Sequence, residues 1–337
     1  MPEKPSIMLS RMNDTFIDAL TRGDLDGIRR CPKADLHNHA YLGGCRKYLF
    51  ERTGHDIAPL DHKLGSTEEM HGWVAAHIKP VLKGGKGRLL AYQATLVLAR
   101  DDGVTRVEFG DDVSANRGGL VTGAEWLTQS IREMLGAIAP EIEWIPLVGM
   151  MRDTPVADLT RLLDPFLELG YYRPLDLYGD EFSQPIENFR AIYRGAKASG
   201  LRLKAHVGER GTADDAWRAV EVLELDEVQH GIAAATSPAI MRKLADHGIR
   251  LNVCPTSNVQ LGRVESLATH PIRKLYDAGV KVTVNTDDAL VFGRSVSEEL
   301  LGLHRAGVFT AAELDVIRLN GLNDEWRPGS MPSQTRS

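Results

Sequence analysis

Short apolar runs rich in β-branched residues alternate with longer amphipathic stretches along most of the chain. From the second run onward they recur at intervals of about 20 to 40 residues, which is the length that a strand, a loop and a crossover helix require. The pattern predicts eight strands, at Ala34–Leu36, Thr105–Gly110, Glu143–Val148, Leu175–Tyr178, Arg202–Val207, Val228–Gly231, Arg250–Val253 and Lys281–Asn285. Eight βα repeats favour one parallel (β/α)8 TIM barrel over residues 1–326, followed by a disordered Pro- and Ser-rich tail at 327–337.

Helix boundaries agree with this reading. Capping residues predict helix starts at Thr212, Ser237-Pro238 and Ser183-Gln184-Pro185, and glycines predict helix ends at Gly200, Gly248 and Gly279. A doubly wound sheet is the alternative fold, but no G-x-G-x-x-G follows the first predicted strand.

About seventy residues separate the first two predicted strands, far more than one barrel repeat needs. Helices are expected at Thr67–Leu82 and Lys86–Arg100 within this insertion, and also at Ile7–Ile28 before the first strand. Because an insertion after a barrel strand lies over the catalytic face, residues 67–100 are a candidate lid. Trp73 is a candidate substrate contact there, with ordinary core packing as the alternative.

Composition narrows the class of protein. A formal net charge of −6 argues against general binding to nucleic acid, and no run of 18 apolar residues could span a membrane. The N-terminus has no apolar segment typical of a secretory signal, and three cysteines without pairing spacing suit a reducing compartment. We therefore expect a cytoplasmic protein, and nothing in the sequence indicates its oligomeric state.

Candidate chemistry collects at the carboxyl ends of the predicted strands. His37 and His39 lie two residues apart, so a strand presents both imidazoles on one face, as a divalent metal site requires. Later strands end in Asp176–Glu181, His206-x-x-Glu209, His230-Gly231, Cys254–Asn258 and Asn285-Thr-Asp-Asp288. Each of these residues alone could be a cap or a surface charge, but a barrel brings all of them to one mouth.

This combination resembles the adenosine/adenine deaminase family of the amidohydrolase superfamily over about residues 31–325. The resemblance implies a single metal ion, usually zinc, held by His37, His39, His206 and Asp287. It implies that Glu209 exchanges a proton with purine N1 and that His230 orients or deprotonates the metal-bound water. Asp288 would contact N7, and the backbone of Gly179 would meet N3.

Elementary chemistry agrees with those roles. A divalent metal lowers the pKa of its water toward ~7, and a buried protonated glutamic acid can protonate the ring nitrogen as water adds. The zinc deaminases of the cytidine type need C-x-x-C, which is absent here. We therefore expect a metal-dependent hydrolytic deaminase with a small purine-like substrate. Hydrolysis of another C–N or ester bond, or a non-catalytic ligand-binding barrel, are the alternatives.

Two departures from the family pattern concern the substrate. Tyr41 stands where an acidic residue normally contacts ribose, and Val107–Asp112 places acids where many members carry arginine. Arg46 and Lys47 follow closely and would add positive potential at the rim, unless both are solvated. A substrate unlike plain adenosine is expected: a free base, a modified nucleoside, or one with an anionic or bulky tail, contacted by Tyr41.

Overall fold

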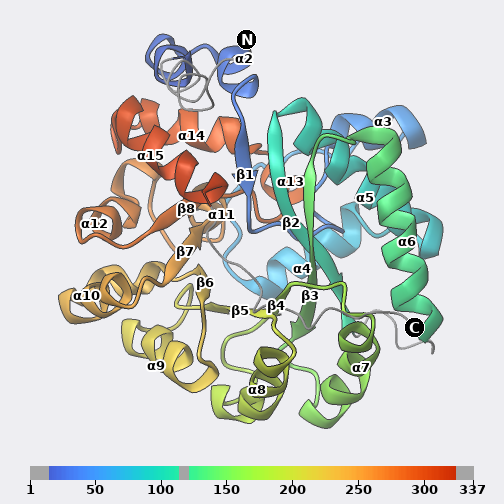
Figure 1. Cartoon of the computed structure of the whole chain (residues 1–337). Helices are drawn as coiled ribbons and strands as arrows, with labels where there is room; N and C mark the ends of the chain where they lie inside the picture. Colours follow the sequence, from blue (N-terminus) through green and yellow to red (C-terminus); the bar gives the residue numbers. More distant parts are fainter. Residues whose placement is uncertain (1–14, 114–120, 324–337) are drawn as a thin grey trace, which may run out of the picture.

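The computed structural model describes residues 15–113 and 121–323 of the 337-residue chain. Eight parallel strands lie side by side in sequence order, with helices around them (Figure 1). They are β1 (Lys33–Asp35), β2 (Val104–Asp112), β3 (Glu143–Met151), β4 (Pro174–Tyr178), β5 (Arg202–Val207), β6 (Glu227–His230), β7 (Arg250–Val253) and β8 (Val282–Val284). The predicted barrel is confirmed, and the strand bounds differ from the predicted ones by at most three residues.

The ring closes between its last and first strands through one parallel bridge, Asn38 to Asp287. The Asp287 amide donates to the His37 carbonyl at 2.9 Å, and the His39 amide donates to the Asp287 carbonyl at 3.4 Å. Closure of the barrel therefore places the His-x-His segment directly beside the acidic segment that follows β8.

Most helices pack on the outside of the barrel. The α-helices are α2 (Leu25–Arg29), α3 (Arg46–Thr53), α4 (Thr67–His77), α5 (Gly84–Asp101), α6 (Val121–Ile138), α7 (Val156–Glu168), α8 (Arg190–Ala198), α9 (Ala213–Leu223), α10 (Pro238–Asp246), α11 (Pro255–Gln260), α12 (Ile272–Asp277), α13 (Ala289–Phe292), α14 (Val296–Arg305) and α15 (Ala311–Leu322). Short 3₁₀ helices occur at η2 (Ile186–Phe189), η3 (Ile232–Thr236) and η4 (Leu267–Thr269), and residues 15–22 are also helical.

The predicted helix boundaries are largely confirmed. Thr212 forms a capping box with Asp215 at the start of α9, and Ser237 caps α10. Gly200, Gly248 and Gly279 all have positive φ after a helix, as expected. The helix predicted at Lys86–Arg100 is α5, which begins two residues earlier and ends one residue later. Two differences are larger: α4 ends at His77 rather than Leu82, and the helix expected after Ser183–Pro185 begins as η2 before it becomes α8. The predicted tail at 327–337 lies outside the described residues.

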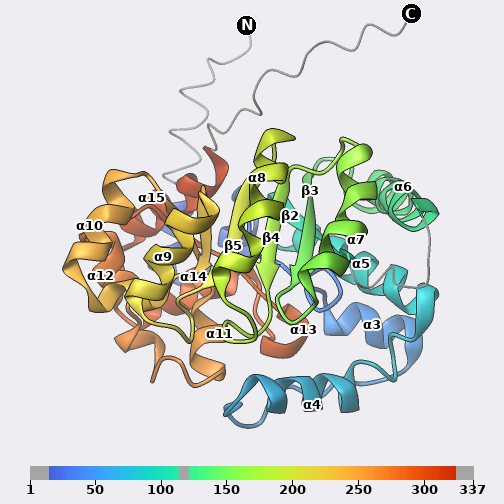
Figure 2. The same ribbon diagram turned by 90° about the horizontal axis from the view of Figure 1, so that it is seen from below.

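The insertion between β1 and β2 has a small apolar core of its own. This core is formed by residues of α3, α4, α5 and the segments between them, which pack on α13 and on the end of α11: Leu49, Ile57, Leu64, Met70, Val74, Ile78, Leu82, Ala91, Ala94, Leu261, Leu290, Val291 and Phe292. Figure 2 shows α4 outside the ring of barrel helices, on the same side as α3 and α13. Buried apolar surface thus anchors the insertion to the segment after β8 that carries the site.

Charged side chains fill part of the barrel interior. Along β5, Arg202, Lys204 and His206 alternate with apolar residues, and all six residues of the strand are buried. The Lys204 ammonium contacts Glu108 and lies 2.9 Å from Glu227, which also accepts from Arg202 at 2.6 Å. Buried charges require partners of opposite charge, so Arg202 and Lys204 form a buried ionic layer with Glu108 and Glu227. Among the described residues, no helix is long and apolar enough to cross a bilayer.

Candidate active site

Three imidazoles and one carboxylate meet at the carboxyl ends of β1, β5 and β8. His37 Nε2 lies 2.9 Å from His206 Nε2, which lies 3.2 Å from His39 Nε2. Asp287 Oδ1 lies 3.3 Å from His39 Nε2 and 3.7 Å from His37 Nε2. The four residues that the resemblance implies as metal ligands are thus brought together.

The contacts of Nδ1 in His37 and His206 determine whether Nε2 of each ring carries a proton or a lone pair. His37 Nδ1 lies 3.0 Å from the Asn252 carbonyl, which can only accept, so His37 donates there and its Nε2 carries a lone pair. His206 Nδ1 donates in the same way to Asp176 Oδ1 at 3.2 Å. Two lone pairs that face each other at 2.9 Å repel unless a cation lies between them. Bonds of 2.0–2.1 Å in a tetrahedral zinc site imply ligand separations of about 3.3 Å, so the donor set fits such an ion.

Asp287 and His230 both have left-handed backbone, with φ of +60° and +63°. Such strain in a residue other than glycine costs about 1–3 kcal/mol and persists only where surrounding contacts enforce it. For Asp287 these contacts are the backbone bond to His37 and the Ser257 hydroxyl, which donates to Oδ2 at 2.6 Å. The strain turns both side chains toward the three imidazoles.

Glu209 lies next to this cluster, on the connection after β5. Its Oε2 is 3.9 Å from His230 Nε2, and its Oε1 accepts from Asn258 Nδ2 at 3.5 Å. Burial raises the pKa of the Glu209 carboxyl to about 8, and the negative charges of Asp287 and Glu181 act in the same direction. A carboxyl group with that pKa carries a proton at neutral pH, as the sequence-based role of Glu209 requires.

A chain of hydrogen bonds defines the tautomer of His230. The Ile272 amide donates to His270 Nδ1 at 3.1 Å, so the neutral His270 ring donates from Nε2 to Asn258 Oδ1 at 3.2 Å. The Asn258 amide nitrogen therefore faces His230 Nδ1, 3.3 Å away, and donates to it. His230 then carries its proton on Nε2, which points toward Glu209 and Asp287 Oδ2, each 3.9 Å away.

Asp288 is buried beside the same ligands. Burial raises the pKa of its carboxyl to about 7. Its Oδ1 has no hydrogen-bond partner within the described part of the chain, although buried polar atoms are nearly always satisfied. Gly179 directly follows β4 with φ of +98°, a backbone conformation that L side chains rarely adopt.

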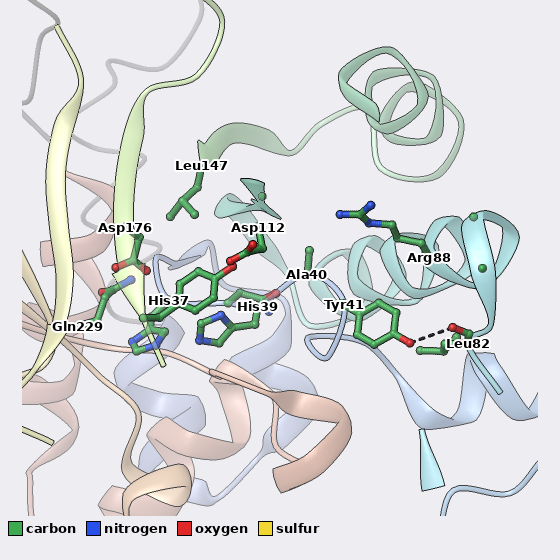
Figure 3. Close-up of a pocket in the computed structure, with 15 residues that line it drawn as sticks. His37, His39, Ala40, Tyr41, Leu82, Arg88, Asp112, Leu147, Asp176 and Gln229 are labelled. Carbon is green, nitrogen blue, oxygen red and sulfur yellow. Dashed lines mark hydrogen bonds between the residues drawn. The ribbon is translucent and has the colours of Figure 1, made fainter. Parts of the chain in front are cut away.

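A cavity of about 550 Å³ opens beside the imidazoles, within the range typical of small-molecule sites. Its walls are formed by His37, Asn38, His39, Ala40, Tyr41, Leu82, Gly84, Gly85, Arg88, Gly110, Asp112, Leu147, Asp176, Tyr178 and Gln229. Figure 3 shows Arg88 extending from α5 toward this space, and the Tyr41 hydroxyl bonded to the Leu82 carbonyl at 2.9 Å. The Tyr41 ring thus lines the cavity, while its hydroxyl group donates to the Leu82 carbonyl of the insertion.

Trp73 does not line this cavity. Its ring lies 4.9 Å from that of His77, with the Arg46 guanidinium 5.9 Å away, and it packs against the core of the insertion. Arg46 donates to the carbonyls of Leu290 and Val291, both at 2.7 Å, whereas the Lys47 side chain is 84% exposed. The Arg46 guanidinium is therefore occupied in holding α13, so it is neither the solvated charge nor the rim charge that the sequence suggested.

The sequence reasoning did not single out several residues of the site. Asp176, Tyr178 and Glu181 lie in the quoted segment after β4, but nothing in their spacing distinguished them. The Tyr178 side chain is partly buried and lies near Asp112. The loss of hydration first, and then the Asp112 carboxylate, raise the pKa of its phenol well above the usual range. Arg88 comes from the insertion, where no local signal shows which side chain reaches the cavity.

A parallel (β/α)8 barrel with His-x-His after β1, a histidine in β5 and an aspartate after β8 defines a metal-dependent hydrolase of the amidohydrolase type. The model of the family described as adenosine deaminase matches residues 144–334. A Treponema pallidum protein provisionally named adenosine/adenine deaminase is 33% identical over 301 residues, covering 87% of this chain and 98% of that protein. An adenosine deaminase of Serratia proteamaculans is 38% identical over 180 residues, which are 53% of this chain and 54% of that one.

The solved structure of an adenine deaminase from Arthrobacter aurescens superimposes with a TM-score of 0.75 at 25% identity, covering 86% of this chain and 92% of that chain. The chain therefore belongs to the adenosine/adenine deaminase family. It is a hydrolase whose reaction is the metal-dependent hydrolytic deamination of an aminopurine. The predicted family and reaction class are confirmed, and the roles of single residues remain predictions.

Proposed function

We propose that His37, His39, His206 and Asp287 hold one zinc ion. The supporting observation is the convergence of three imidazole nitrogens and one carboxylate oxygen, with the Nδ1 contacts of His37 and His206 turning their Nε2 lone pairs inward. Three nitrogens and one carboxylate oxygen are ligands that zinc accepts, and because zinc can also take a fifth ligand, this set would leave room for water. When bound, a divalent ion lowers the pKa of a water toward ~7 and so supplies the nucleophile at neutral pH.

Glu209 is the general acid of this proposal. Addition of water oxygen to the carbon that carries the amino group removes the aromaticity of the ring, so the adjacent ring nitrogen must take a proton. The protonated Glu209 carboxyl supplies it, and Asn258 orients that carboxyl by donating to Oε1. The proton that the attacking water loses returns to the Glu209 carboxylate. Collapse of the adduct moves the remaining hydroxyl proton to the amino group, which leaves as ammonia, with an oxo group on the ring carbon.

His230 acts as an orienting donor rather than as the base. Burial lowers the pKa of its ring to about 3, so it is neutral, and the hydrogen bonds from His270 through Asn258 leave the proton on Nε2. A neutral imidazole with Nε2 protonated donates to the attacking water and cannot accept its proton. Asp288, with an unpartnered buried oxygen, contacts N7 in this scheme, and the Gly179 backbone meets N3.

The substrate proposed is an aminopurine other than plain adenosine. The cavity wall at Tyr41 offers an aromatic ring in place of a carboxylate, and Arg88 adds a cation beyond it. A free base, a modified nucleoside or a derivative with an anionic or bulky tail fits these walls better than plain adenosine, because the ribose hydroxyls would find no carboxylate at Tyr41 to accept their hydrogen bonds. Trp73 packs outside the cavity, so a contact to substrate from that residue would require movement of α4.

The test is ammonia release from adenine, adenosine, N6-substituted and 5′-substituted adenosines, compared by kcat/KM. Tyr41→Asp restores the acid, and Tyr41→Phe is the matched control that removes only the hydroxyl bonded to Leu82. We expect wild type to prefer a substrate other than adenosine and Tyr41→Asp to gain on adenosine relative to Tyr41→Phe. A wild-type preference for adenosine with no such gain contradicts the proposed pocket.

A further inference from the structure

One buried carboxylate holds the backbone of the segment that carries Glu209. Glu181 Oε2 accepts from the amides of Gly208 at 2.8 Å and Gly211 at 3.3 Å. Its Oε1 accepts from the amides of Glu209 at 2.9 Å and Arg210 at 2.7 Å. Four consecutive amides thus converge on one side chain.

These four residues are the whole connection between β5, which ends at Val207, and Thr212, the cap of α9. Gly208 has φ of +68°, and this left-handed turn directs the following amides inward toward one point. The connection has no strand or helix partner for these amides. Without Glu181, four amides in a partly buried segment would need new partners, and each one left buried and unsatisfied costs about 1–3 kcal/mol.

Glu181 lies outside the catalytic cluster and does not line the cavity beside the imidazoles. It follows Asp180, which holds the same connection from its exposed side through an ion pair with Arg210 at 2.9 Å. The two acids therefore hold the connection differently: Glu181 accepts four hydrogen bonds, one buried and three partly buried, and Asp180 forms one partly exposed ion pair. Surface pairs of that kind contribute only about 0–1 kcal/mol.

We infer that Glu181 is a positioning residue, which fixes the backbone at Glu209 so that its carboxyl group reaches the ring nitrogen of the substrate. This inference rests on the proposed role of Glu209 as the acid. Asn258 orients the Glu209 carboxyl group by donating to Oε1, and Glu181 fixes the Glu209 backbone by accepting from its amide. Proton transfer depends on distance so steeply that a shift of about 1 Å can cost ~10²-fold in rate.

The experiment compares Glu181→Gln and Glu181→Ala with Asp180→Asn, the matched control in the same loop. Glutamine keeps one accepting oxygen and presents an amide NH₂ where two backbone amides also donate, so it disturbs half of the contacts. We expect kcat to fall by about 10- to 100-fold in Glu181→Gln, with KM within about threefold and metal content unchanged. Asp180→Asn should stay within about threefold of wild type in kcat.

The deciding measurement combines each change with Glu209→Gln. If Glu181 acts through Glu209, Glu181→Gln causes no further loss of kcat once the acid is absent. Loss of kcat by the same factor in both backgrounds, or loss of metal in Glu181→Gln, overturns the inference in favour of a general structural role. Wild-type kcat in Glu181→Gln overturns it while leaving the acid role intact, whereas wild-type kcat in Glu209→Gln overturns both. Glu181→Gln decides the question even if Glu181→Ala does not fold.

Discussion

The sharpest prediction concerns Glu209→Gln, because the surroundings of this side chain separate binding from proton transfer. In the variant, the amide oxygen takes the place of Oε1 and still accepts from Asn258. The amide NH₂ then takes the place of Oε2 and still donates a hydrogen bond to a ring nitrogen. What the glutamine lacks is a proton that it can transfer.

The expected loss follows from this separation. General acid catalysis contributes ~10²–10⁴-fold, which corresponds to about 2.7–5.5 kcal/mol of transition-state stabilisation. We expect kcat to fall by that factor while KM changes only a few-fold, because the hydrogen bond to the bound ring remains. The metal ligands lie elsewhere, so metal content should match that of wild type.

The pH dependence should change as well. Burial raises the pKa of Glu209 to about 8, and the group must be protonated to act, so wild-type kcat should fall on the alkaline side. A bound divalent cation favours the carboxylate, so the alkaline limb of the holoenzyme should lie below that value. Glu209→Gln should show no such limb.

The measurements are steady-state ammonia release from pH 5 to 10, metal content by plasma mass spectrometry, and titration of a purine ligand by calorimetry. A kcat within tenfold of wild type, with the alkaline limb intact, would refute the role of Glu209 as proton donor. Loss of metal in the variant would refute the claim that acid and metal site are separate.

Three further predictions concern the metal and the stability of the fold. His206→Ala should lose most of the bound metal, whereas His55→Ala, an exposed histidine after α3, should keep it; full occupancy in both would contradict the ligand set. Burial raises the pKa of the Glu299 carboxyl to about 7, so the folded state of wild type loses stability as pH rises from about 4.5 through 7. Glu299→Gln has no such carboxyl, so in urea unfolding it should gain up to about 3 kcal/mol relative to wild type across that window. Lys204→Met should lose about 3–5 kcal/mol of unfolding free energy because two buried carboxylates, Glu108 and Glu227, each lose one of their cationic partners, whereas Lys197→Met, at an exposed pair with Glu224, should change it by less than about 1 kcal/mol.

The sequence predicted the barrel well because the spacing of strands and helices is a local signal. β5 was predicted to the residue, although Arg202, Lys204 and His206 alternate along it as in a half-exposed strand. Its charged face points into the barrel instead of toward solvent, and the partner Glu108, on β2, lies three strands away along the sheet. Sequence spacing cannot show such a partner, because the partner is adjacent only after the barrel has closed.

The candidate ligands could be predicted because parallel strands all end at one side of the barrel. The positive φ values of His230 and Asp287 could not, because neither residue is a glycine and nothing in the local sequence favours a left-handed backbone there. The Tyr41 bond to Leu82 and the position of Arg88 depend on how the insertion folds back over the site. Side chains that reach the site from the insertion are therefore the part that a single sequence cannot show.

The ionic layer and the proposed metal site are one connected structure. The Leu36 carbonyl, directly before His37, accepts from Lys204 Nζ and from Gln229 Nε2, both at 3.4 Å. Asn252 donates from its side chain to Glu227 and Gln229, and its carbonyl accepts from His37 Nδ1. A shift of these charged side chains would therefore move the backbone next to His37 and the Asn252 carbonyl that orients the His37 ring. A buried ionic layer often stabilises a fold less than apolar packing would. We therefore expect this layer to contribute mainly by orienting His37, so Lys204→Met should weaken metal binding as well as lower the stability of the fold.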